Sequence, residues 1–153
     1  MKIKIEIDDS LMEEEIVIRC KSLSEDVISI QKRISDAVNS RMQLEVSKGE
    51  KEYYITIDEI LFFETEGKTV TAHTADKMYE TQYRLYELEE MLPGYFMRIS
   101  KSTIVNLNQI YSITRNLTAS SVIEFSDSIK KVYVSRNYYK SLIERMGEKR
   151  KRL

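Results

Sequence analysis

The first forty residues alternate between short apolar runs and charged stretches. Isoleucines alternate with charged residues over 3–7, which is typical of a strand with one buried face. An acidic, turn-like stretch over 8–15 is followed by a second apolar run at 16–18. From 27 to about 40 the apolar residues recur every three or four positions, which predicts a helix. We therefore expect a small strand–strand–helix extension, of mixed β and α structure, over residues 1–41.

The pattern changes at residue 42 to many short β-branched and aromatic runs separated by turn residues. One helix is expected over 83–92, stopped by the Pro93-Gly94 pair, and a second closes the domain over 138–146. Strands are expected at 43–46, 53–57, 60–63, 68–73, 77–81, 110–113, 121–125 and 132–134. This spacing predicts a mainly β domain with short helices over residues 42–153, ending in a basic tail at 149–152.

Charge is distributed unevenly along the chain. The net charge of −1 argues against a nucleic-acid binder when it is taken as an average. Residues 1–95, however, hold 12 basic and 21 acidic side chains, while residues 96–153 hold 12 basic and 4 acidic ones. An excess of basic residues confined to one part of a chain indicates a face that binds a polyanion, or at least a basic tail.

The sequence lacks the residue sets that enzymes, metal sites and membrane spans require. Its single cysteine, Cys20, excludes an internal disulfide and a multi-cysteine metal site. Its single histidine, His73, has no second histidine and no glutamate at HxxE spacing with which to form a metal site or a catalytic pair. We therefore interpret it as an ordinary strand residue. The longest apolar runs are only a few residues, and the alternating N-terminus does not resemble a signal peptide. We expect a cytoplasmic protein that is not an enzyme and has no metal, cofactor or small-molecule substrate.

Two polar segments hold residues that could bind a nucleic acid. Within 95–106, hydroxyls and cations lie between apolar residues, at Arg98, Ser100, Lys101 and Ser102. Such groups suit phosphate oxygens, although a polar loop beside a core strand would have the same composition. Near the C-terminus, Arg136 and Asn137 follow a strand just before a helix. Arginine can bond two acceptors on a guanine edge, and asparagine can do so on adenine.

Three blocks of the sequence resemble LytTR DNA-binding domains, in the order and spacing of that family. They are IDEILFFE at 57–64, FMRISKSTIVN at 96–106 and IYSI at 110–113. The closing Val134-Ser135-Arg136 with its short helix is also similar, so the resemblance covers about residues 42–146. It implies a bacterial transcription-factor module, a LytTR-type β domain that reads successive major grooves of duplex DNA through loops.

The resemblance also implies which residues would contact DNA. The expected base contacts are Lys101, Arg136 and, in the first loop, Lys68 or its neighbour Thr69. The expected contacts to the DNA backbone are Arg98, Ser100, Ser102 and Asn137. Asn106, at the end of the second block, is explained as well by a local turn as by DNA contact.

The extension is too short for the receiver domain that precedes many LytTR domains. It resembles instead the extension of stand-alone regulators, which are often encoded beside small membrane proteins. The resemblance therefore implies a homodimer on direct-repeat sites, with a small membrane protein as a possible regulator. One alternative stays open: a protein-interaction module of the same fold that has lost DNA binding and acts with a membrane-protein partner.

Overall fold

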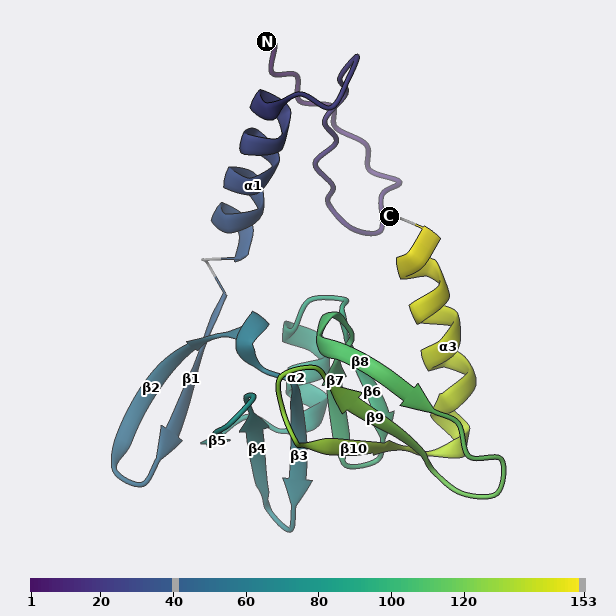
Figure 1. Cartoon of the computed structure of the whole chain (residues 1–153). Coiled ribbons are helices and arrows are strands. Elements are labelled where there is room, and N and C mark those ends of the chain that lie inside the picture. Colours follow the sequence, from purple (N-terminus) through teal and green to yellow (C-terminus); the bar gives the residue numbers. More distant parts are fainter. Residues whose placement is uncertain (40–41, 152–153) are drawn as a thin grey trace. The chain divides into compact units, whose positions relative to one another are not determined.

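The computed structural model describes residues 1–39 and 42–151, and it divides into two compact units, Met1–Val38 and Asn39–Leu153 (Figure 1). The predicted boundary at residue 41 lies outside the described residues, as do Arg152 and Leu153 at the end of the predicted basic tail. The rest of that tail continues a helix through Lys151. Each unit is described separately below.

The first unit contains one helix, α1 (Glu25–Asn39). At its start the Ser24 hydroxyl accepts a hydrogen bond from the Val27 amide at 3.3 Å, and Glu25 and Asp26 suit the positive helix end. The strands predicted at 3–7 and 16–18 are absent: residues 1–24, all described, include turns and bends but no helix or strand. That prediction is wrong for the single chain, in which neither run pairs with another strand.

The second unit is built on two antiparallel sheets. The larger has the order β2-β1-β5-β4-β3-β7-β6 and the smaller β10-β9-β8. The seven strands of the larger sheet are β1 (Gln43–Lys48), β2 (Lys51–Thr56), β3 (Phe62–Glu66), β4 (Thr69–His73), β5 (Met78–Thr81), β6 (Phe96–Ser100) and β7 (Thr103–Asn106). The smaller sheet holds β8 (Ile110–Thr114), β9 (Ser121–Phe125) and β10 (Lys131–Val134). The helices are α2 (Leu85–Met91), α3 (Arg136–Lys151) and two 3-10 turns, η1 (Ile57–Glu59) and η2 (Leu107–Gln109).

The mainly β prediction is therefore confirmed, with three local differences. The strand predicted at 60–63 begins only at Phe62, because η1 precedes it. The segment 96–106 is a β-hairpin, so only Lys101 and Ser102 lie in its turn. The last helix begins at Arg136 rather than 138, so this arginine belongs to the helix and not to the loop before it.

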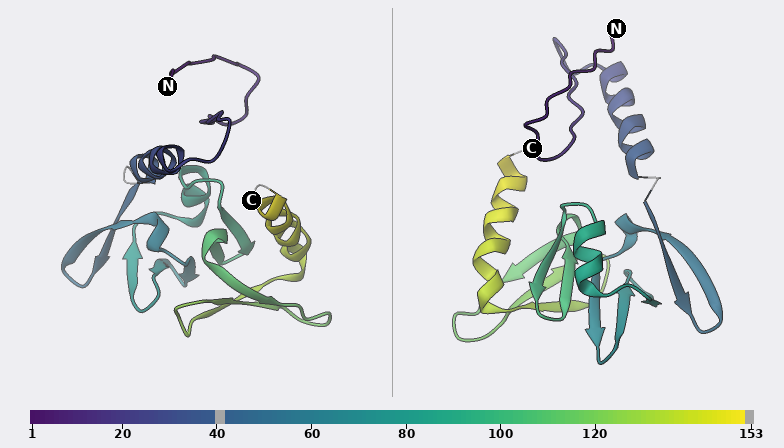
Figure 2. Two further views of the ribbon diagram at one scale, coloured as in Figure 1. Left: turned by 45° about the horizontal axis from the view of Figure 1, so that its top comes forward. Right: turned by 180° about the vertical axis from the view of Figure 1, so that it is seen from behind.

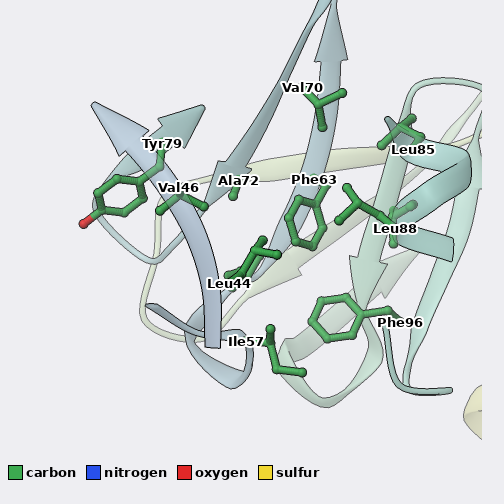
Figure 3. Packing of buried hydrophobic residues seen from close by; sticks show 12 residues of the cluster. Leu44, Val46, Ile57, Phe63, Val70, Ala72, Tyr79, Leu85, Leu88 and Phe96 are labelled. Carbon is green, nitrogen blue, oxygen red and sulfur yellow. The ribbon is translucent and has the colours of Figure 1, made fainter. Parts of the chain in front are cut away.

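Two hydrophobic clusters lie on opposite faces of the larger sheet. Phe63 belongs to the first, with residues of α2 and of strands β1, β4, β5, β6 and β7; Figure 3 labels Leu44, Val46, Ile57, Val70, Ala72, Tyr79, Leu85, Leu88 and Phe96 in this cluster. Phe62, the preceding residue, belongs to the second, with residues of the smaller sheet and Leu142 of α3. Phe62 stacks on Phe125 of β9 with ring centroids 5.7 Å apart. Adjacent strand residues point to opposite faces, so these two phenylalanines join β3 to both clusters.

Asn106 holds the start of β3 against the end of β7 and is completely buried. Its side-chain amide donates to the Ile60 carbonyl at 2.9 Å, while its side-chain oxygen accepts from the Asn108 amide at 3.0 Å. Its backbone amide donates to the Leu61 carbonyl at 2.8 Å. A buried asparagine with these partners supports the explanation by a local turn, and it leaves no exposed atom for DNA.

His73 lies between an aromatic ring and a carboxylate on one face of β4. Its ring stacks on Phe62 at 4.3 Å, and its Nε2 lies 3.7 Å from Glu64 Oε2. Burial, with a smaller contribution from the charge of Lys130, lowers the pKa of His73 to about 4, so the imidazole is neutral at pH 7. Burial also raises the pKa of Glu64, and the charge of Glu66 adds to this. The contact is therefore not an ion pair at neutral pH.

We expect Asn106→Ala to lower the free energy of unfolding by about 1–3 kcal/mol, because it leaves the Ile60 carbonyl and the Asn108 amide without their partner. Urea denaturation followed by circular dichroism measures this change. The matched control is Asn108→Ala, an exposed side chain two residues away, which should change stability by less than about 0.5 kcal/mol. Equal effects of the two substitutions would contradict the role given to Asn106.

Stability should also fall as the pH is lowered from about 6.5 towards 4. In this range the unfolded histidine takes up a proton and the folded one does not, so protonation favours unfolding. His73→Phe keeps the stacking on Phe62 and removes the titration. Urea midpoints at several pH values should therefore decline more steeply over this interval in the parent than in His73→Phe. Parallel declines would show that His73 does not titrate in this way.

Candidate nucleic-acid interface

Three turns of the second unit each present one of the cations singled out in the sequence. The first joins β3 to β4 through only two residues, Gly67 and Lys68, as the pairing of Glu66 with Thr69 requires. Gly67 has a φ of +61°, whereas the φ of Lys68 is not positive, which matches a type II′ hairpin turn. This tight turn leaves the Lys68 side chain exposed.

The second turn, Lys101-Ser102, joins β6 to β7 and is equally short, since Ser100 pairs with Thr103. The register shifts between Arg98 and Ser100, so Ile99 is an extra residue in β6. Its side chain is fully buried in the second cluster. The Ser100 hydroxyl accepts from the Ser102 amide at 3.2 Å, and the two hydroxyls lie 3.4 Å apart. Lys101 and Ser102 are both exposed.

The third turn leads from β10 into α3 through Ser135. Arg136 and Asn137 form the start of the helix, and both are exposed. The Ser135 carbonyl accepts from the Tyr138 amide at 3.0 Å, which stabilises the first turn of the helix. The N-terminus of a helix carries partial positive charge, which adds to that of Arg136 and attracts anions.

Two backbone hydrogen bonds hold the three turns side by side. The Thr65 amide, next to the first turn, donates to the Ser102 carbonyl in the second at 2.8 Å. The Ser135 amide, in the third turn, donates to the Ile99 carbonyl beside the second at 3.0 Å. The turns therefore lie along one end of the unit; the tip of the β3–β4 hairpin and the start of α3 both lie towards the bottom of Figure 1, and the right-hand view of Figure 2 shows them from behind.

Arg98 lies beneath the second turn and is engaged within the chain. Its Nε donates to the Ser100 carbonyl at 3.0 Å and its Nη2 donates to the Lys101 carbonyl. Its Nη1 donates to Glu89 on α2, forming an ion pair. The guanidinium therefore fixes the backbone that presents Lys101. Only two of its five N–H groups remain for the phosphate contact predicted from the sequence.

Arg84, which the sequence analysis missed, belongs to this end of the unit. It is exposed, and its Nη1 donates to the carbonyl of Lys68 at 3.2 Å, so it supports the first turn from the residue before α2. Arg84 lies sixteen residues from Lys68 and in no recognisable motif. No pattern in the sequence indicates that the two meet; only the folded sheet brings them together.

Other cations of the basic C-terminal half have structural partners. Lys130 Nζ donates to the carbonyls of Thr74 and Lys77, and burial lowers its pKa despite the opposing charge of Asp76. Lys131 pairs with Glu124 on the neighbouring strand at 3.2 Å. Arg115 lies over the Tyr139 ring, 5.2 Å from its centroid. The basic excess of this half therefore overstates the charge available to a ligand.

Two cavities lie in this unit, and neither is lined by residues of the three turns. One, of about 340 Å³, lies at the opposite end of β4, beside the β4–β5 and β9–β10 turns. The other, of about 270 Å³, is lined by four glutamates, Glu45, Glu52, Glu80 and Glu87, and would repel a polyanion. Among the described residues there is no group of three or more histidine, cysteine or acidic side chains placed to hold a metal ion. In the same residues no helix is long and apolar enough to cross a membrane.

Comparison with known proteins gives one family. The sequence model of the LytTr DNA-binding domain matches residues 50–147. An uncharacterized HTH-type transcriptional regulator of Staphylococcus aureus (strain NCTC 8325 / PS 47) is 33% identical over 148 residues, which are 96% of this chain and 99% of the relative. Its counterpart in strain MRSA252 is 32% identical over the same length.

A solved structure agrees with the fold. A LytTr DNA-binding domain from Bacillus cereus aligns with a TM-score of 0.60 at 21% identity, over 66% of this chain and 95% of the other. This match confirms the predicted LytTR-type β fold. The relatives are named as helix-turn-helix regulators, but in the part of the chain that the structure describes, five strands separate α1 from α2 and five separate α2 from α3. No two of these helices are joined by a short turn.

We expect Arg98→Ala to loosen the second turn without unfolding the domain, because two bonds from the guanidinium to turn carbonyls are lost. Protection from hydrogen exchange at the Ser100 to Thr103 amides should fall by roughly tenfold, as expected for the loss of about 1–2 kcal/mol of charge-assisted hydrogen bonding. Mass spectrometry of pepsin fragments measures this exchange.

Glu89→Gln is the matched control, since it removes the ion pair but leaves both bonds from Arg98 to the turn. It should leave exchange in the turn nearly unchanged. Unchanged exchange in Arg98→Ala would instead show that the hairpin keeps its order without the guanidinium.

Proposed function

This chain belongs to the LytTr DNA-binding domain family, and we propose that it regulates transcription by binding duplex DNA sequence-specifically through the three turns at one end of its β domain. The family and its relatives are DNA-binding transcriptional regulators and not an enzyme family. The proposal adds which surface meets DNA and what each residue does there.

The observation that carries the proposal is the placement of the three turns. Residues far apart in the sequence, Lys68, Lys101 and Arg136, are exposed on turns linked by the Thr65–Ser102 and Ser135–Ile99 hydrogen bonds. Three cations along one edge match a ligand with regularly spaced negative charge, such as a duplex. The glutamate-lined cavity is built from β1, β2, β5, the segment that leads into α2 and Glu87 of α2, and it includes none of the residues of the three turns.

The side chains divide into three roles. Lys68, Lys101 and Arg136 reach base edges, where Lys and Arg donate to guanine. Ser100, Ser102 and Asn137 bind phosphate oxygens and set the register on the duplex. Arg98 and Arg84 hold the backbone of the second and first turns in position, through the carbonyls of Ser100, Lys101 and Lys68. The phosphate contact predicted for Arg98 stays a prediction. It would have to be made by the two N–H groups that are not bonded within the chain.

The width of the turns supports insertion into major grooves. A two-residue hairpin turn is narrow enough for a groove about 12 Å wide, which also admits a two-stranded ribbon. The third turn brings the N-terminus of α3 with Arg136. We propose that neighbouring turns occupy successive major grooves, with phosphate contacts between them.

The proposed assembly is a homodimer on direct-repeat sites in the cytoplasm, where a regulator meets the chromosome. A small membrane protein could control it, as the resemblance to stand-alone regulators implies. The relatives align over 96% of this chain, so the region before the β domain is shared with them. That shared region is the natural place for assembly or control.

Substitution of the proposed base contacts tests this function. Bound fragments are first selected from the genome of the source organism, and affinities are then measured by fluorescence anisotropy on a selected and a scrambled duplex. Arg136→Ala and Lys101→Ala should each lose about 1–3 kcal/mol on the selected duplex, roughly 5- to 150-fold, and much less on the scrambled one.

Lys77→Ala is the matched control, since it removes one exposed positive charge from the opposite end of β4. It should bind both duplexes almost like the parent. The proposal fails if Arg136→Ala binds both duplexes as tightly as the parent does. If no genomic fragment binds with an affinity that weakens as salt rises, the chain is the interaction module without DNA binding.

A further inference from the structure

The first eight residues belong to no helix or strand, and their apolar side chains are uncovered. Ile3, Ile5 and Ile7 expose 95%, 84% and 95% of their surfaces. The charged residues alternate with them, and Lys4 Nζ bonds Glu6 Oε1 at 2.5 Å, so these two side chains lie together on one face. The segment ends at Asp8, whose carboxylate accepts from the amide and hydroxyl of Ser10. In a β-strand this alternation would place the isoleucines on one face and the charged residues on the other, as in one half of a β-ribbon.

The order of charges within this segment is complementary to itself. It reads lysine at 2 and 4, then glutamate at 6 and aspartate at 8, with isoleucines between them. When two copies run antiparallel about Ile5, Lys2 lies opposite Asp8 and Lys4 opposite Glu6. The isoleucines then pair with isoleucines, and Ile5 meets its own copy on the twofold axis. Every charged pair in this register has opposite signs.

The competing pairings place like charges opposite one another. In a parallel, in-register pair each residue faces its own kind, so lysine faces lysine. In a hairpin within one chain, which pairs this segment with the apolar run at 16–18, matching the isoleucines places Lys4 opposite Arg19 and Asp8 opposite Glu15. Like charges directly across an antiparallel pair are destabilising. This explains why the single chain leaves both runs unpaired.

We infer that residues 2–8 form an antiparallel β-ribbon with the same residues of a second copy, and that this ribbon is the core of the homodimer. The partner is therefore a second copy of this chain, and the ribbon is isologous, with the same residues contributed from both sides. The twofold symmetry applies to the ribbon alone, because two β domains on a direct repeat have the same orientation along the duplex and do not share that axis. The inference rests on the homodimer proposed above and gives it a surface and a register.

The ribbon also explains why other apolar residues of the first unit are exposed in the single chain. A two-stranded ribbon is marginal by itself and needs a cover for its apolar face. Six isoleucines, three from each copy, would gather on that face. Apolar side chains of the same unit are exposed and available to cover them: Leu11, Ile16, Val17, Leu23 and Ile28. We assign the cover to these residues.

Charge exchange in the full-length chain tests the pairing. An acidic variant carries Lys2→Glu and Lys4→Glu, and a basic variant carries Glu6→Lys and Asp8→Lys. Each places like charges at all charged pairs and should raise the dimer dissociation constant by roughly tenfold or more, measured by sedimentation without DNA. An equimolar mixture should recover a heterodimer, which also shows that both variants fold. Two variants that stay dimeric alone, or a mixture that stays monomeric, would overturn the pairing.

Cysteine cross-linking tests the register. In a Cys20→Ser background, Ile5→Cys should form a disulfide-linked dimer under mild oxidation, because the two copies of residue 5 are directly opposite. Ile3→Cys is the matched control: its two copies would lie about 13 Å apart along the ribbon, beyond the reach of a disulfide. Equal cross-linking of the two variants, or none in Ile5→Cys, would contradict the register.

The result of the dimer tests can be distinguished from the result of the DNA-binding test. A monomeric chain that still binds the selected duplex would remove the dimer and leave the three-turn interface intact. A chain that is dimeric but does not cross-link at residue 5 would keep the homodimer and exclude this ribbon. Loss of DNA binding in Arg136→Ala tests the interface alone, since residue 136 lies outside the ribbon.

Discussion

The burial of β3 on both of its faces is the constraint on which the second unit depends. Phe62 and Phe63 are consecutive, and each belongs to a different hydrophobic cluster. Because side chains alternate along a strand, a slip of one residue would move each phenylalanine to the wrong face, so the register of β3 with β4 and β7 is strongly specified. The buried amide of Asn106 fixes the same strand at its start. The turns at the far end of β3 and β7 therefore have little freedom.

Short turns convert this rigid sheet into a defined surface. Two-residue connections leave Lys68 and Lys101 with well-determined backbone positions, and Arg98 and Arg84 bind the carbonyls of those same turns. A side chain that must recognise a base edge benefits from such support, because less conformational entropy is lost when it binds. In the proposed interface, the sheet and the two arginines supply the rigidity of the turns.

Much of the β domain could be predicted from short β-branched and aromatic runs separated by turn residues. Contacts between residues that are distant in the sequence could not be predicted in this way. Arg98 looked like a phosphate ligand because its composition and neighbours suit one, but its partners Glu89 and the turn carbonyls are set by the packing of α2. Arg136 was placed before the helix because the apolar periodicity starts only at Tyr138. The predicted strands at 3–7 and 16–18 are not formed in one chain, because their charges disfavour pairing with each other.

Amide chemical-shift mapping on addition of a selected duplex tests the central claim most directly, because it reports every part of the domain at once. The three-turn interface predicts the largest changes at Gly67 to Thr69, Lys101 to Ser102 and Ser135 to Asn137. The β4–β5 and β9–β10 turns, at residues 75–77 and 126–128, should change little. Large changes confined to these latter turns, with the first three unaffected, would contradict the account.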